Sequence, residues 1–167
     1  MTFNIDSLIS NYFSSGKVTG LPYGHFINGE YVKSQGEKTL ESFDPGSENV
    51  LGTFACGDYR DIENAVASSR KAFKNWKKVA PAKRGEILYR AAQLMKKNSA
   101  WLSFIECLDS GKTLAEAEGD ISGSARLLEY YAGAADKLDG RSVPLAGDYM
   151  GWTIREPIGV TAHIIPW

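Results

Sequence analysis

The side chains in this sequence with the greatest chemical reactivity are the thiols of Cys56 and Cys107. Cys56 shortly precedes Asp58, the expected start of a helix, where the helix dipole can stabilise a thiolate and favour a nucleophile. No histidine is spaced so as to act as a base for this thiol, so packing at the end of a strand is the preferred interpretation. Cys107 lies in an apolar helical stretch and is expected to pack as well. The sequence therefore predicts no complete catalytic set.

Metal and phosphate sites are not predicted either. His25 and His163 stand far apart, and the two cysteines are too few and too widely spaced for a zinc site or a disulfide framework. His163 is interpreted as a residue of the core or of a cleft edge. Residues 109–112, Asp-Ser-Gly-Lys, lack the glycine spacing of a phosphate loop and follow a helix, so they are predicted to end that helix at Gly111. An acidic cluster is expected to form a solvated helix face: Glu116, Glu118 and Asp120.

Four helices with one apolar face each are predicted over residues 58–140. An aspartate that can cap free N–H groups opens the first, and a proline suited to the first turn opens the second. Gly140 is a typical C-terminal stop and is expected to end the fourth. A further short helix, followed by a surface arm, is expected within residues 1–24. The four longer helices start near Asp58, Pro81, Ser99 and Asp120.

A hairpin is predicted before these helices. Asn28 and Gly29 lie between apolar β-forming residues and supply the positive φ angles of a tight turn within 26–33. A further strand is expected at 39–43, followed by an Asp-Pro-Gly turn.

A second hairpin is predicted after the helices, with strands at 141–145 and 150–156. Trp152 and Ile154 alternate with polar residues, so one face of this hairpin is apolar. Such a hairpin is hard to bury within a small domain, and the sequence leaves two alternatives for covering its apolar face. It pairs with another chain, or it folds back on its own helices.

The last residues of the sequence, 158–167, form a near-continuous apolar run that predicts a parallel strand covered on both faces. In open α/β sheets, ligands bind just beyond the carboxyl ends of such strands. We therefore expect an α/β fold in which a cofactor site begins where this segment stops.

Composition excludes several classes of protein. The 167 residues carry a formal net charge of −1, so a basic surface for nucleic acid is not expected. No apolar run reaches membrane-spanning length, and the first six residues lack the features of a signal peptide. With few cysteines, the expectation is a cytoplasmic protein with free thiols.

Six segments, in order along the chain, resemble the aldehyde dehydrogenase superfamily: 26–32, 44–45, 108–112, 130–133, 155–160 and 164–167. The resemblance implies that the chain is the N-terminal portion, roughly the first third, of such an enzyme. Residues 1–139 would then be the arm, hairpin and helices of the cofactor-binding domain. Residues 140–157 would protrude and complete a sheet in a neighbouring subunit of a homo-oligomer, a dimer or a tetramer. Residues 158–167 would be the first strand of a doubly wound dinucleotide-binding sheet.

The resemblance also implies the chemistry. Members of the superfamily oxidise an aldehyde to a carboxylate with NAD or NADP, through a cysteine thioester, with an asparagine amide holding the oxyanion. The asparagine would follow Trp167, and the cysteine and a glutamate base would lie further on. Cys56 and Cys107 match neither position, so no catalytic residue is assigned here. The isolated chain is expected to be inactive.

Three groups of site residues follow from the resemblance alone. The cofactor cleft would be lined by the last four residues, mainly through backbone and wall contacts. The substrate entrance would include Gly123 and Leu127, with Gly123 widening it. Some relatives bind a structural monovalent cation through backbone oxygens matching Phe43 and Asp109. The cofactor residues are Ile164, Ile165, Pro166 and Trp167.

Two other hypotheses fit the same residues. A truncated product could act as an interaction module that joins the oligomer of a full-length relative through its second hairpin. A prematurely terminated gene would have no function.

Overall fold

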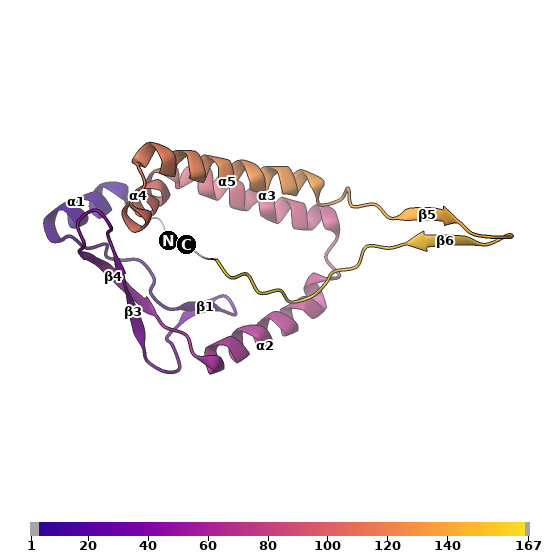
Figure 1. Cartoon of the computed structure of the whole chain (residues 1–167), viewed down its shortest axis with the longest axis horizontal. Coiled ribbons are helices and arrows are strands. Elements are labelled where there is room, and N and C mark those ends of the chain that lie inside the picture. The colour runs from indigo at the N-terminus through magenta and orange to yellow at the C-terminus, as the bar shows by residue number, and fades with distance from the viewer. Residues whose placement is uncertain (1–3, 166–167) are drawn as a thin grey trace.

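The computed structural model describes residues 4–165, and all statements about structure refer to this range. The structure combines helices and strands and is of the α/β class, as predicted (Figure 1). In chain order the elements are α1 (Ile5–Ser15), β1 (His25–Ile27), β2 (Glu30–Val32), β3 (Thr39–Phe43), β4 (Val50–Ala55), α2 (Tyr59–Trp76), α3 (Pro81–Lys97), α4 (Ser99–Ser110), α5 (Leu114–Ala134), β5 (Arg141–Pro144) and β6 (Met150–Thr153).

Local signals in the sequence account for most helix boundaries. Asp58 caps α2, and its side chain accepts hydrogen bonds from the backbone of Arg60 and Asp61. Pro81 occupies the first turn of α3, where its missing N–H costs nothing. Gly111 ends α4 with φ of 73°, a left-handed conformation that glycine adopts without strain. These three predictions are confirmed.

The fourth predicted helix has different bounds. It begins at Leu114 rather than near Asp120, because Thr113 and Glu116 form a capping box about two turns earlier. Glu116 therefore caps a helix as well as belonging to an acidic face. The helix ends at Ala134 rather than at Gly140, because the chain turns there and the Lys137 N–H donates to the Ala134 carbonyl at 3.0 Å.

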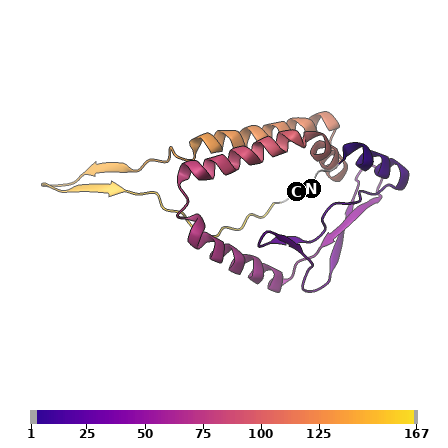
Figure 2. The ribbon, with the colours of Figure 1, turned by 180° about the vertical axis from the view of Figure 1, so that it is seen from behind.

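Two helices, α3 and α5, run side by side in both views (Figures 1 and 2). Their close approach depends on Gly85, since a Cβ there would lie 2.5 Å from the Ala132 carbonyl oxygen. Small buried residues line this contact region, including Ala92 on α3 and Ala125 on α5. The small apolar core of the molecule therefore sits around α3, α4 and α5.

The described strands form three separate antiparallel pairs. The β1–β2 hairpin turns at Asn28 and Gly29, with φ of 55° and 85°, as predicted. The predicted strand Thr39–Phe43 is present as β3, but its partner is β4 and not the first hairpin. Cys56 directly follows β4, which confirms its interpretation as a residue at the end of a strand.

The β5–β6 hairpin projects away from the rest of the molecule (Figures 1 and 2). Trp152 is 73% exposed and Ile154 is 82% exposed, so the apolar face stays uncovered within the described chain. The structure therefore rules out the alternative in which the hairpin folds back on its own helices.

Residues 154–165 form no strand, which corrects the prediction of a buried strand over 158–167. The segment runs between α2 and the pair α3–α5 (Figures 1 and 2). Ile158 and Ile164 are 91% and 93% exposed. A central parallel strand needs hydrogen-bonding neighbours and helices on both faces, and no described strand pairs with this segment.

Candidate functional site

The residues predicted to bind the cofactor lie on the extended segment at the centre of the molecule. Ile164 and Ile165 project apolar side chains that are exposed in this chain. Pro166 and Trp167 lie outside the described residues. The two apolar side chains and the backbone beside them fit the role expected of these residues. That role is contact with the flat surfaces of a dinucleotide rather than catalysis.

The residues predicted to form the substrate entrance lie on one face of α5. Gly123 and Leu127 are four residues apart and therefore neighbours on the helix surface. Both are exposed, and a Cβ built at Gly123 would meet no atom within 4 Å. The described chain leaves open space at this point, which fits a wide entrance.

Two adjacent tyrosines follow on α5. Tyr130 and Tyr131 pack edge to face, with ring centroids 5.3 Å apart. Both are exposed, at 69% and 55%. They line an apolar groove of about 560 Å³ between α3 and α5, whose other members include Trp76, Ile87, Leu88 and Leu138.

The residues predicted to hold a cation lie in one region, where β3 meets the end of α4. The Ser42 hydroxyl donates to the Asp109 carboxylate. Ser42 immediately precedes Phe43, and the pairing of β3 with β4 shifts register between them. Pro45 packs against Gly111 just beyond. No cluster of three or more acidic, cysteine or histidine ligands occurs among residues 4–165, so a cation bound by backbone oxygens stays a prediction.

The two cysteines have structural surroundings. The Cys107 thiol donates to the Lys112 carbonyl over 3.1 Å. The Cys56 carbonyl accepts from the Ser34 hydroxyl at 2.6 Å, and its N–H donates to Lys38. In the part of the chain that is described, neither thiol has a hydrogen bond to a histidine or carboxylate. The packing interpretation is the one that this geometry favours.

A buried carboxylate that the sequence did not reveal joins α2 to the region of the first hairpin. Asp61 accepts from the Asp58 N–H, the Gln35 N–H and the Ser34 hydroxyl at 2.9 to 3.1 Å. The hydrogen bond from the Asp58 N–H above all, then those from the Gln35 N–H and the Ser34 hydroxyl, hold the pKa of Asp61 below its ordinary value. His25 Nε2 lies 3.7 Å from Asp61 Oδ2. The sequence showed only the helix cap, because the other partners are remote along the chain.

A second buried carboxylate, Asp44, fixes the turn after β3. It accepts from the Ser47 hydroxyl at 2.7 Å, the Gly46 N–H at 2.8 Å and the Tyr12 hydroxyl at 2.5 Å. The hydrogen bond from Ser47, followed by that from Tyr12, lowers the pKa of Asp44. The same contact raises the pKa of Tyr12. This cluster ties α1 to the β3–β4 pair and leaves no vacant group for chemistry.

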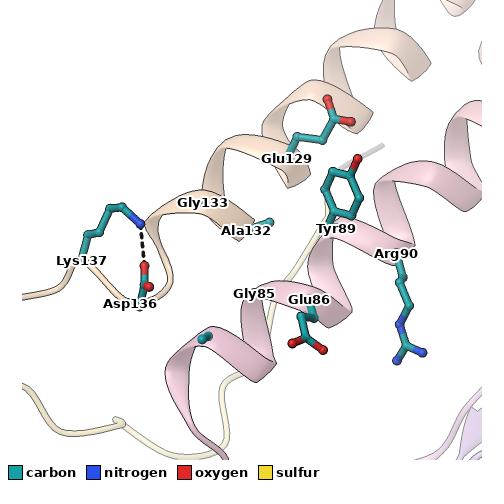
Figure 3. Close-up of a pocket in the computed structure, with 10 residues that line it drawn as sticks. Gly85, Glu86, Tyr89, Arg90, Glu129, Ala132, Gly133, Asp136 and Lys137 are labelled. Carbon is teal, nitrogen blue, oxygen red and sulfur yellow. Dashed lines mark hydrogen bonds and ion pairs between the residues drawn. The ribbon is translucent and has the colours of Figure 1, made fainter.

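A hollow of about 690 Å³ lies on the surface between α3 and α5 (Figure 3). Gly85 and Ala132, whose backbones approach closely, line this hollow together with Tyr89. Lys137 pairs with Asp136 at 2.6 Å, and Glu129 pairs with Lys96 outside the hollow at 2.6 Å. Because charges of both signs are present and partly paired, the hollow carries no clear preference for a charged ligand.

Comparisons with solved structures first define the class of protein. An indole-3-acetaldehyde dehydrogenase of P. syringae in complex with NAD+ and IAA superposes with a TM-score of 0.82 and 32% identity, over 95% of this chain and 32% of that one. A betaine aldehyde dehydrogenase of Staphylococcus aureus in complex with NAD+ gives a TM-score of 0.74 and 30% identity, over 77% of this chain and 27% of that one. The fold is therefore that of the N-terminal portion of an aldehyde dehydrogenase.

Sequence comparison defines the family. The model of the aldehyde dehydrogenase family matches residues 31–167. An aldehyde dehydrogenase-like protein of Schizosaccharomyces pombe is 40% identical over 97% of this chain and 32% of its own length. An aldehyde dehydrogenase of Aspergillus niger is 41% identical over 87% of this chain and 30% of its own length. This chain belongs to the aldehyde dehydrogenase family, and it spans about a third of the curated relatives it matches.

Proposed function

We propose that this chain supplies the N-terminal part of the cofactor-binding domain of an NAD(P)-dependent aldehyde dehydrogenase, which oxidises an aldehyde to a carboxylate. The observation that carries the proposal is the family match over residues 31–167. Structural neighbours that hold NAD+ support the choice of cofactor.

In this proposal residues 158–167 act as the first strand of the dinucleotide-binding sheet. Two observations support that role. The segment is extended and leaves Ile158, Ile164 and Ile165 uncovered. It also faces α2, whose Ile62 is 64% exposed although it belongs to the apolar face of that helix. Strands from a further part of the protein would bury both sets of side chains and provide the missing backbone partners.

Catalysis is assigned to residues outside this chain. The dinucleotide, when bound, supplies the hydride acceptor, and a cysteine thiolate attacks the aldehyde. Neither Cys56 nor Cys107 is activated by a neighbouring base among the described contacts. What this chain contributes is a wall of the cofactor cleft and one side of the substrate entrance, at Gly123 and Leu127.

The test is aldehyde-dependent formation of NADH or NADPH. The 167-residue chain alone is expected to give none. A protein in which a full-length relative's downstream segment follows this chain is expected to be active with a short aldehyde. Turnover by the isolated chain would refute the assignment of catalysis to other residues, and an inactive but folded fusion would count against the dehydrogenase function itself.

A second function is supported by the exposed β5–β6 hairpin. The chain on its own would act as an interaction module that joins the oligomer of a full-length dehydrogenase through residues 140–157. Stable co-purification of the tagged chain with a full-length dehydrogenase subunit is expected if this holds. Absence of any complex between the two purified proteins would exclude it.

A further inference from the structure

The charges of this chain are unevenly distributed along it. Residues 64–85 contain seven basic side chains and no acidic one. Because the whole chain carries a formal net charge of −1, removing these seven cations leaves the remaining residues at −8. The net charge, from which a basic surface is not expected, therefore averages a strongly basic segment and an acidic remainder. The seven are Arg70, Lys71, Lys74, Lys77, Lys78, Lys83 and Arg84.

Five of these cations lie along the C-terminal half of α2 and just beyond it, and we call them the basic stripe. They occur at i, i+1, i+4, i+7 and i+8, a spacing that keeps side chains on one face of a helix. The last turn continues past Trp76, since the Lys77 N–H donates to the Phe73 carbonyl at 3.0 Å. All five are exposed, and they are Arg70, Lys71, Lys74, Lys77 and Lys78.

The cations of the basic stripe are not neutralised by carboxylates. Among residues 4–165, none of the five takes part in an ion pair. Lys77 lies 5.8 Å from the centre of the Phe73 ring, a contact that leaves its charge in place. By contrast, Lys83 at the start of α3 pairs with Glu86. Like charges three and four residues apart repel one another, so an anionic partner would stabilise the stripe.

The basic stripe is separate from the apolar face of α2. At about 100° per residue, its five positions span an arc of about 120°, and Ile62, Val66 and Phe73 fall outside this arc. Residues 154–165, which belong to the proposed dinucleotide-binding sheet, run between α2 and the pair α3–α5 (Figures 1 and 2). A sheet that covers the apolar face of α2 would therefore leave the basic stripe accessible.

The shape of the basic stripe fits a line of negative charge better than a plane of it. Five cations on a narrow arc extend about 12 Å along the helix, at about 1.5 Å per residue. The phosphates of a nucleic acid form such a line, with about one charge per 1.7 Å of a duplex. A helix that binds a lipid surface instead adds apolar side chains that enter the interface, and the stripe contains none.

We propose that the basic stripe binds the phosphate backbone of duplex nucleic acid without sequence preference. This inference goes beyond the proposed dehydrogenase function and does not depend on it. Four of the five cations are lysines, whose compact charges contact phosphates and do not read base edges. Each neutralised phosphate releases a counterion, so the logarithm of the binding constant should fall with the logarithm of salt concentration at a slope of about −4 to −5.

A triple substitution tests the stripe, with fluorescence anisotropy of a short labelled DNA duplex as the measurement. The wild-type protein should bind two unrelated duplex sequences equally. Lys71→Gln, Lys74→Gln and Lys78→Gln together should weaken binding about tenfold or more at low salt and make the salt slope shallower by about 3. Glutamine and lysine have similar helix propensity, and circular dichroism checks that α2 is retained.

A matched control removes three lysines that lie elsewhere on the surface. Lys17→Gln, Lys33→Gln and Lys97→Gln together change the net charge by the same amount, and all three positions are exposed. This variant should bind the duplex like wild type. An equal loss in the two triple variants would show that the charge of the whole molecule attracts the duplex, and would overturn the proposal. A folded stripe variant that binds like wild type would overturn it as well.

Acetylation of the unmodified protein gives a readout that does not depend on a variant's folding. With the duplex in excess, mass spectrometry should show that acetylation of Lys71, Lys74 and Lys78 is slowed several-fold. Acetylation of Lys17 and Lys33 should be unchanged. Equal protection of all five lysines would contradict binding at the stripe.

Sedimentation with lipid vesicles tests the other class of anionic partner. Vesicles of phosphatidylcholine and phosphatidylserine in equal parts present a plane of negative charge. The protein should bind the duplex at a salt concentration at which it does not sediment with these vesicles. Binding to the vesicles without binding to the duplex would overturn the assignment to nucleic acid, and binding to neither would overturn the site itself.

Discussion

At the scale of single residues, two buried carboxylates hold together segments that are distant in sequence. Asp44 joins the turn after β3 to Tyr12 on α1, and Asp61 joins α2 to the loop that holds Ser34. Each is charged and accepts at least three hydrogen bonds, so the ionised form is the one that the fold stabilises. Their function in this chain is to position elements.

The first prediction concerns Asp44 and pH. Because its pKa is lowered in the folded state, Asp44 contributes stability above the ordinary aspartate range, and this contribution is lost as the pH falls below about 4. Asp44→Asn should therefore lower the midpoint of thermal unfolding at neutral pH, and the difference from wild type should narrow in acid. Circular dichroism melts over a pH series measure both. Asp148→Asn, at an exposed position of the hairpin turn, is the control and should match wild type.

At the scale of elements, the packing of α3 against α5 is set by one missing side chain. A Cβ at Gly85 would lie 2.5 Å from the Ala132 carbonyl oxygen and 3.3 Å from the Ala135 Cβ. Neither neighbour is a flexible side chain that could move aside. The close approach of the two helices therefore depends on glycine at this position.

Gly85→Ala is expected to lower the free energy of unfolding by about 1–3 kcal/mol, since the helices must separate to admit a methyl group. Gly119→Ala is the matched control on α5, because a Cβ there meets nothing within 4 Å. At that site alanine should stabilise the protein by about 1 kcal/mol, through its better helix propensity. Urea unfolding of both variants measures whether each substitution lowers or raises the free energy of unfolding. Equal effects would show that the close contact is not what requires Gly85.

At the scale of the whole molecule, the last described residues run between α2 on one side and α3 and α5 on the other (Figures 1 and 2). The buried apolar residues are few and mostly small, and they include Leu8, Leu51, Ala92, Leu108, Ala117 and Ala125. Large apolar side chains remain uncovered on α2, on α5, on the hairpin and on residues 154–165. No helix of the described residues is long and apolar enough to cross a membrane. Uncovered apolar surface of this extent is typical of a surface that another part of a protein or a partner covers.

The isolated 167-residue chain is accordingly expected to bind a hydrophobic dye such as ANS and to self-associate as its concentration rises. Replacing Trp152 and Ile154 by serine should reduce self-association while leaving dye binding at α2 and α5 largely unchanged. Fluorescence titration and sedimentation velocity report these two properties separately. A chain that stays monomeric and binds no dye would contradict the exposed surface seen in the structure.

The sequence by itself determined the local elements. Asp58, Pro81, Gly111 and the Asn28-Gly29 turn act within a few residues of themselves, so their signals could be interpreted without knowledge of the fold. The ordered resemblance of six segments was also sufficient to indicate the family. The predicted start of α5 near Asp120 is wrong, because the capping box at Thr113 opens the helix before the apolar pattern begins.

Only the tertiary structure decided which distant residues meet. The contact of Tyr12 with Asp44, the contact of Ser34 with Asp61, and the dependence of α3–α5 packing on Gly85 all join residues far apart in the chain. It also decided that the second hairpin projects outward, and that residues 154–165 form no strand in this chain. The physical reason is that hydrophobic periodicity shows which side chains need to be buried, whereas the segment that buries them can lie anywhere in the chain or in another part of the protein.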